Sequence, residues 1–174
     1  MKYIILSLFS VLMACAGIPE NIKPITDFNV NRYVGKWYEI ARLDNRFERG
    51  LREITAEYSL RDDGGINVIN SGVNVESGKR ESAEGKAYFI DKPNVGSLEV
   101  SFFGPFYGGY HIIDLDKENY RYAMIAGSDS DYLWILSRTP NLDEAVLISL
   151  TAKAKALGYA TEKLIFPKQS LVDR

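Results

Sequence analysis

The chain has 174 residues, a formal net charge of −2, one cysteine and one histidine, and 46% of its residues are apolar. This apolar content supports one domain with a real core, and the lack of a basic surplus argues against a nucleic-acid partner. The single histidine, His111, cannot by itself build a His-rich metal site, and we expect no metal and no cofactor.

The first 14 residues are typical of a bacterial secretory signal. Lys2 precedes an apolar run that ends at Leu12, and this run is shorter than the ~20 residues of a membrane-spanning helix. Cys15, which follows directly, resembles the acylated cysteine of a lipobox. We therefore expect residues 1–14 to be removed and Cys15 to be lipidated. An ordinary secretion signal with an incidental cysteine, or a buried N-terminal helix, is the alternative.

Residues 15–27 are expected to form the lipidated N-terminus and a tether. They contain two prolines, Pro19 and Pro24, and little apolar periodicity. About 12 extended residues would reach at most ~40 Å. The folded domain is then expected over residues 28–174.

Eight short strands separated by turns are predicted next. Alternation of apolar and polar residues, as in Ile54–Leu60, indicates strands with one buried face. The Asp62-Asp63-Gly64-Gly65 segment is typical of a hairpin turn. The predicted strands are 37–43, 54–60, 66–75, 84–90, 98–102, 110–115, 120–126 and 132–137.

A helix follows the strands. Pro140 to Glu144 is typical of a helix start, and Gly158 is typical of a C-cap. Val146, Leu150, Ala154 and Leu157 recur at helical spacing and give one apolar stripe. A short extra strand is predicted over residues 161–166.

Eight consecutive antiparallel strands need partners for both edges of their sheet. Closure into an up-and-down β-barrel supplies them, and an eight-stranded barrel can hold one small ligand. We therefore predict an all-β protein, an eight-stranded antiparallel barrel with one C-terminal helix packed outside. A β-sandwich is the structural alternative.

Three motifs carry a resemblance to a known family. Gly35-Lys36-Trp37 begins the first predicted strand, Ser130-Asp131-Tyr132 precedes the eighth, and Arg138 ends it. This pattern resembles the lipocalin family, and longer runs such as residues 100–110 and 131–140 resemble its bacterial outer-membrane members. The resemblance implies a calyx that holds a fatty acid or lysophospholipid, in envelope lipid storage or transport.

The resemblance also implies structural roles for the motif residues. Trp37 would plug the closed end beneath the Arg138 guanidinium, and Asp131 would tie the backbone of the preceding turn. None of these roles is catalytic, and we expect no enzymatic activity. The expected location is the outer membrane, facing the periplasm and anchored through Cys15.

Candidate ligand-binding residues come from strand alternation. The apolar faces of the predicted strands supply Ala56, Tyr58, Ala87, Phe89, Val100, Phe102, Tyr122, Met124 and Trp134. Gly85, like Ala56 and Ala87, is small enough to leave a cavity. The headgroup would meet the open end, with candidates Arg42, Asn45, Arg46, Phe47, Glu48, Arg49, Phe106 and Tyr107.

Other functions stay open from the residues alone. The barrel could be packed solid in a structural envelope lipoprotein, or could carry another hydrophobic ligand such as a tetrapyrrole bound through His111. The aromatic loop at Phe106 and Tyr107 would suit a lid, a membrane contact or a homodimer with a second copy of the chain.

Overall fold

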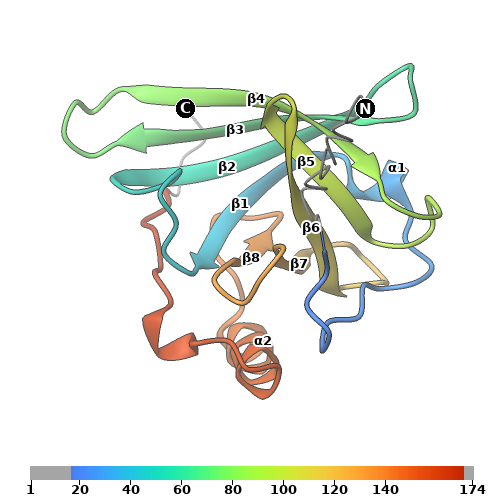
Figure 1. Ribbon diagram of the computed structural model, residues 1–174. Helices are drawn as coiled ribbons and strands as arrows, with labels where there is room; N and C mark the ends of the chain where they lie inside the picture. The colour runs from blue at the N-terminus through green and yellow to red at the C-terminus, as the bar shows by residue number, and fades with distance from the viewer. Residues whose placement is uncertain (1–16, 171–174) are drawn as a thin grey trace, which may run out of the picture.

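The computed structural model describes residues 17–170, which contain one closed barrel (Figure 1). Each strand pairs antiparallel with its neighbours in the chain, and β1 also pairs with β8. This confirms the predicted barrel. The strands are β1 (Gly35–Arg42), β2 (Leu51–Leu60), β3 (Ile66–Asn74), β4 (Arg80–Phe89), β5 (Ser97–Phe103), β6 (Phe106–Leu115), β7 (Tyr122–Ala126) and β8 (Leu133–Ser137).

Because successive strands run in opposite directions, successive loops lie at opposite ends of the barrel. The β1–β2, β3–β4, β5–β6 and β7–β8 loops share one end, which we call the open end. The remaining loops share the other end with the short helix α1 (Val30–Tyr33), and we call it the closed end. Any residue can therefore be assigned to an end from its strand and its position along it.

Apolar side chains form two clusters on opposite faces of the barrel wall. In β8, Leu136 belongs to the inner cluster, while Leu133 and Ile135 belong to the outer cluster. The alternation follows from the period of two in a strand. Both faces of β7 and β8 are apolar because the outer face is also covered.

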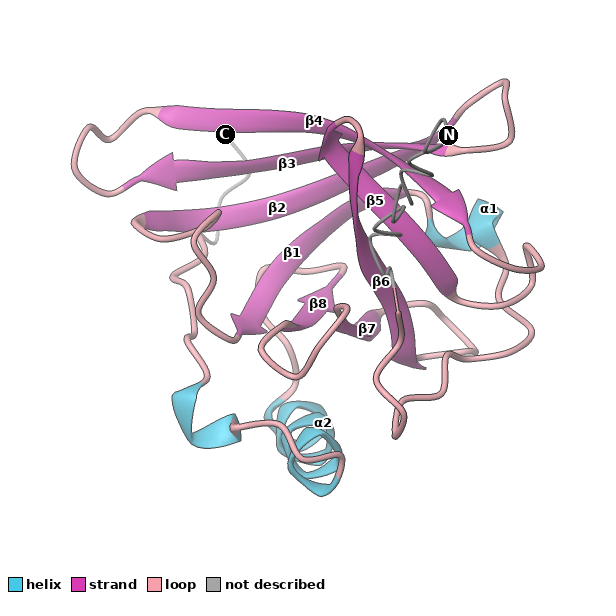
Figure 2. Cartoon of the chain, viewed as in Figure 1, coloured by secondary structure: helices cyan, strands magenta, loops and turns pink. Residues whose placement is uncertain are grey.

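The outer cover is the helix α2 (Glu144–Ala156), which lies beside the barrel (Figure 2). Asp143 caps its start by accepting hydrogen bonds from the backbone N–H groups of Ala145 and Val146. Leu150 and Ala154 are buried against the barrel, and Gly158 follows the helix with a φ of +92°. The predicted helix, its apolar stripe and its cap are confirmed.

The strand predicted over residues 161–166 is wrong. The segment begins with the 3₁₀ helix η1 (Thr161–Lys163) and continues to one isolated bridge between Ile165 and Arg42. The β1–β2 pairing runs only from Gly35 to Tyr38 on β1, so the rest of β1 can pair with this segment on that side. The Gln169 Nε2 atom then donates to the carbonyl oxygens of both Glu39 and Ile54, joining β1 to β2.

Part of the tether expected over residues 15–27 packs against the barrel. Residues 15 and 16 lie outside the described residues, but Ile22 is buried in the outer cluster. The Ile25 N–H donates to the carbonyl of Ile112 at 2.9 Å, and Thr26 forms a bridge with Val95. The second half of this segment is therefore part of the folded domain. Within residues 17–170, no helix is long and apolar enough to cross a membrane.

Candidate functional site

The closed end is sealed by Trp37 and Arg138. Trp37 is fully buried, its Nε1 donates to the Tyr33 carbonyl at 2.8 Å, and the Arg138 guanidinium carbon lies 3.9 Å from the centre of its ring. The guanidinium also spans several chain segments through hydrogen bonds to backbone carbonyls. The acceptors are Arg32, Tyr33, Val34, Lys36 and Tyr120, at 2.8–3.3 Å.

Asp131 and Tyr132 precede β8, as the sequence predicts, and the Asp129 carboxylate holds the backbone of this turn. Both residues lie in the β7–β8 loop at the open end, at the opposite end of β8 from Arg138. Asp129 stabilises that turn, because its carboxylate accepts from the Asp131 N–H at 2.8 Å.

At the closed end the turn beside Arg138 is held by Asp116 and Tyr120. Asp116 accepts from the backbone N–H groups of Asn119 and Arg121, and the Tyr120 N–H donates to the Asp116 carbonyl. Tyr120 also offers its carbonyl to Arg138 and its hydroxyl to the Asn29 N–H. These two residues, and not Asp131 and Tyr132, connect this turn to the seal.

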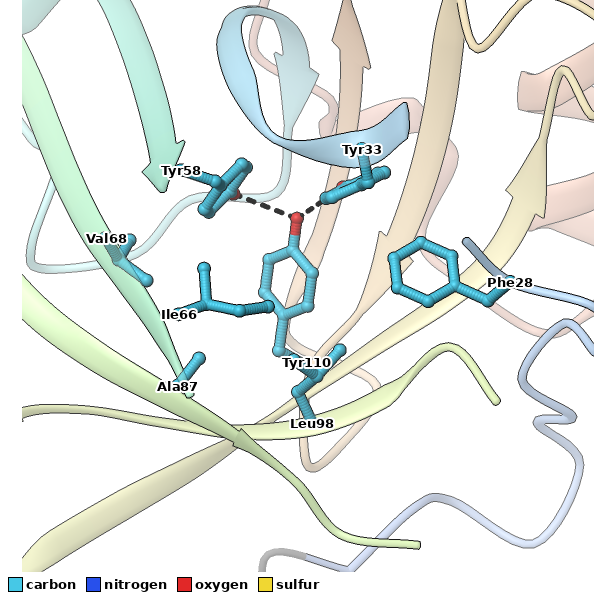
Figure 3. Close-up of a pocket in the computed structure, with 8 residues that line it drawn as sticks. All are labelled: Phe28, Tyr33, Tyr58, Ile66, Val68, Ala87, Leu98 and Tyr110. Atoms are coloured by element: carbon cyan, nitrogen blue, oxygen red, sulfur yellow. Dashed lines mark hydrogen bonds between the residues drawn. The ribbon is translucent and has the colours of Figure 1, made fainter. Parts of the chain in front are cut away.

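Two cavities lie above this seal, inside the barrel. The upper cavity has a volume of about 60 Å³ and the lower one about 20 Å³. The upper cavity is lined by Glu39, Glu48, Ile54, Thr55, Ala56, Tyr58, Asn70, Trp134 and Leu136. The lower cavity is lined by Phe28, Tyr33, Tyr58, Ile66, Val68, Ala87, Leu98 and Tyr110 (Figure 3).

A buried charged cluster forms one wall of the upper cavity. Glu39 and Arg42 are 2% and 3% exposed, and the Arg42 Nη1 donates to the Glu39 Oε1 at 2.9 Å. The Glu48 Oε2 lies 3.7 Å from the Arg42 Nε and accepts from the Trp134 indole N–H at 3.0 Å. One guanidinium therefore faces two carboxyl groups, and the buried Asn70 Oδ1 beside them is an acceptor without a partner.

Burial raises the pKa of Glu39 well above its ordinary value, and the neighbouring Glu48 carboxylate raises it further. At a pH between the ordinary value of 4.5 and the raised pKa, the folded state therefore keeps a proton on Glu39 that the unfolded state has released. In the window from the ordinary value of 4.5 up to the raised pKa, stability falls as the pH rises.

We expect Glu39→Gln to remove this part of the pH dependence, because the amide stays neutral at every pH. The measurement is the urea unfolding midpoint of both proteins between about pH 5 and about pH 8. Glu57→Gln, on the exposed outer face of β2, is the control. Parallel pH profiles for wild type and Glu39→Gln would contradict the prediction.

Three tyrosines, Tyr33, Tyr58 and Tyr110, gather at the lower cavity. The Tyr110 hydroxyl oxygen lies 2.6 Å from that of Tyr33 and 2.9 Å from that of Tyr58 (Figure 3). Burial raises the pKa of all three phenols, so they stay protonated and remain hydrogen-bond donors.

The structure brings together only some of the predicted ligand-binding residues. Ala56, Tyr58 and Trp134 line the upper cavity, and Tyr58 and Ala87 line the lower one. Phe89, Val100 and Phe102 pack against the inner cluster but line neither cavity. Gly85 leaves no space for a ligand, because a Cβ there would lie 2.9 Å from the Phe102 ring.

Tyr122 and Met124 are on the wrong face for a ligand. Both belong to the outer cluster that packs against helix α2, while Ala123 and Ile125 of the same strand face the interior. Since β7 is apolar on both faces, its alternation separates the two faces without saying which one is inside.

Sequence reasoning missed most of the residues around the cavities. Alternation along β3 contains the signal for Ile66, Val68 and Asn70, which share one face. Glu39 shares the inner face of β1 with Trp37, but an acidic residue gives no sequence signal of burial. Tyr33 precedes the first strand, so strand periodicity could not find it.

The headgroup candidates at the open end fall into two groups. Arg42, Asn45 and Glu48 are tied to one another inside the mouth, where the Asn45 side chain donates to Glu48. The others lie at the exposed rim, where Arg49 pairs with Asp44 at 2.7 Å. The rim residues are Arg46, Phe47, Arg49, Phe106 and Tyr107, and Phe106 is 73% exposed.

Comparison with known proteins assigns the family. The sequence profile of the lipocalin-like domain matches residues 28–169. The chain belongs to the lipocalin family. It is 51% identical over 170 residues to the outer membrane lipoprotein Blc of Vibrio cholerae, covering 97% of this chain and 99% of that protein. Temperature-induced lipocalin-1 of Arabidopsis thaliana is 36% identical over 160 residues, covering 87% and 84% of the two chains.

Solved lipocalin structures agree with the barrel. Insecticyanin of the tobacco hornworm Manduca sexta superposes with a TM-score of 0.69 at 25% identity, covering 88% of this chain and 87% of that one.

A second sequence relative bears on the location. The Escherichia coli K12 protein, 51% identical over 161 residues and covering 91% of this chain and 90% of that protein, is also an outer membrane lipoprotein Blc. This lipocalin is accordingly a lipid-anchored protein of the outer membrane.

Membership in this family is consistent with binding of a small hydrophobic ligand, since lipocalins are typically carriers rather than enzymes. Within residues 17–170, no three His, Cys, Asp or Glu side chains are grouped so that they could hold a metal ion.

Proposed function

We propose that this lipocalin binds a single-chain lipid, a fatty acid or lysophospholipid, inside its barrel and stores or transports it for membrane biogenesis or repair. The observation that supports this most is the pair of stacked cavities between the open end and the Trp37 seal, the lower one with a wholly apolar lining apart from tyrosine hydroxyls. Both cavities are small, so an acyl chain must displace side chains such as Trp134 as it enters.

The charges of the site favour insertion of the lipid tail first. Glu48 and the Asn70 Oδ1 present acceptors to the upper cavity, and these disfavour a bare carboxylate or phosphate at that depth. The exposed rim carries Arg46, whose guanidinium carbon lies 4.9 Å from the Phe47 ring centre. An anionic headgroup is therefore expected at the rim.

Apolar transfer alone is sufficient for useful affinity. Each methylene removed from water contributes about 0.8 kcal/mol, so about ten buried methylenes offer roughly 8 kcal/mol before association costs. We expect the anchor-free domain, Ala16–Arg174, to bind long-chain fatty acids or lysophospholipids at micromolar affinity or better.

A fluorescence titration tests this expectation. Trp134 lines the upper cavity, whereas Trp37 is sealed at the closed end, so lipid insertion should change the emission of Trp134. Trp134→Phe is the control for the origin of the signal. A folded domain that binds no lipid would favour a structural envelope lipoprotein, and binding of only another class of hydrophobic molecule would favour the alternative carrier function.

We also propose that Cys15 is the lipidated residue, that residues 1–14 are the signal removed before it, and that the domain faces the periplasm. These residues lie outside the described range, and the sequence pattern supports the assignment. Cys15→Ser should release the protein from the membrane fraction, because acyl chains supply the anchoring. Equal membrane association of the variant on fractionation would contradict the assignment. A homodimer stays a prediction that sedimentation can test.

A further inference from the structure

A chain of three tyrosine hydroxyl groups crosses the barrel interior at the lower cavity, and Tyr58 also lines the upper cavity. Tyr58 comes from β2 and Tyr110 from β6, which are four strands apart in the closed barrel and so lie on opposite walls. Tyr33 comes from α1 at the closed end (Figure 3). The central Tyr110 hydroxyl bonds to both others, at 2.6 Å and 2.9 Å, so it joins the two walls and the closed end.

The hydroxyl chain lies on the path that a ligand would take from the open end to the lower cavity. Tyr58 belongs to the linings of both cavities, and among residues 17–170 no other residue does so. Glu48 from the β1–β2 loop and Trp134 near the start of β8 line the upper cavity on its open-end side, and Phe28 and Tyr33 line the lower cavity on its closed-end side. An acyl tail that fills the upper cavity therefore meets Tyr58 before it can reach the lower cavity.

The closed-end member of the chain is firmly held. The Tyr33 carbonyl accepts hydrogen bonds from the Trp37 indole at 2.8 Å and from Arg138 at 3.0 Å. Its ring lies between those of Trp37 and Tyr58, with centroid distances of 4.8 Å and 5.5 Å. Tyr33 therefore cannot move with an incoming tail, and deeper insertion must break the bonds at Tyr110.

Building on the proposed function, we propose that the Tyr33–Tyr110–Tyr58 hydroxyl chain sets how deep an acyl tail enters and so selects ligands by chain length. A tail that passes Tyr58 leaves buried hydroxyls without partners, which is unfavourable. Additional methylenes increase affinity about four-fold each while they find apolar space. The affinity gain should therefore stop at the length at which the tail end reaches Tyr58.

Tyr110→Phe tests the inference, because it removes both hydrogen bonds and keeps the ring. Wild type and variant, each as the full lipidated chain in lipid nanodiscs, are titrated with fatty acids of about 10 to 20 carbons while Trp134 emission is followed. The ratio of the two affinities at each length cancels partition of the fatty acid into the bilayer. Tyr88→Phe, which loses a hydroxyl bonded to Asp63 outside the barrel, is the matched control.

The expected result is a ratio near one for short fatty acids that rises to about ten-fold in favour of Tyr110→Phe for those beyond the wild-type plateau. Tyr58→Phe, which loses only one of the two bonds, should show the same trend more weakly. A ratio that is constant across all lengths, with cooperative unfolding of both proteins, would overturn the inference and leave the tyrosines a structural role. Absence of binding by any protein at any length would instead contradict the proposed function and the inference together.

Discussion

Trp37→Ala should lower the free energy of unfolding by about 3–5 kcal/mol, the usual range for truncation of a large buried aromatic residue. Trp37 is fully buried, its indole N–H is bonded to Tyr33, and the Arg138 guanidinium covers its ring. Its removal leaves a cavity at the closed end and takes away one of the two side-chain hydrogen bonds to the Tyr33 carbonyl, the other being from Arg138. Urea unfolding of the anchor-free domain measures the change.

Two further variants separate the contributions at this seal. Trp37→Phe keeps most of the apolar contact and loses the N–H, so a smaller loss of about 1–3 kcal/mol is expected. Arg138→Ala removes stacking and the bonds to backbone carbonyls, many of which water can satisfy, so it should also destabilise less than Trp37→Ala. If Trp37→Ala lowered stability by less than about 1 kcal/mol, the closed-end seal would not have the role described.

Ala56→Phe should weaken lipid binding roughly 200-fold, because a phenyl ring would occupy the space of about four methylenes worth ~0.8 kcal/mol each. Ala56 lies on the inner face of β2 and lines the upper cavity. The site is better for this purpose than Ala87, which lies in the smaller lower cavity. Calorimetric titration with a long-chain fatty acid measures the loss.

Glu57→Phe is the matched control for Ala56→Phe, since it places the same ring one residue further along β2 on the exposed face. It should bind lipid as wild type does. Overpacking costs about 1–3 kcal/mol, so the thermal unfolding of Ala56→Phe must be followed in parallel. Undiminished lipid affinity in a folded Ala56→Phe protein would exclude the upper cavity as the binding site.

The sequence predicted the architecture because local signals agreed with one another. Alternation in Ile54–Leu60 defined a half-buried strand, and the spacing of Leu150 and Ala154 defined a helix with one apolar face. Gly158, with its positive φ, confirmed the helix end. These signals depend on neighbouring residues, which is why they can be read without the tertiary structure.

The candidate site was harder to predict because it depends on long-range packing. Met124 was assigned to the ligand although the contact with α2 places it on the outer face. Asp131 was predicted to tie the turn before β8, but in that turn the Asp129 carboxylate accepts from the Asp131 N–H. Glu39 and Tyr33 were missed, since burial of an acid and docking of a short helix have no periodic signature.

We propose that the barrel holds one single-chain lipid. The most direct measurement is mass spectrometry of the lipids that co-purify with the Ala16–Arg174 domain exported to a bacterial periplasm, with Ala56→Phe purified in parallel. We expect about one molecule of fatty acid or lysophospholipid per wild-type barrel and much less in Ala56→Phe. A folded wild-type domain without lipid, or equal lipid content in both proteins, would contradict it.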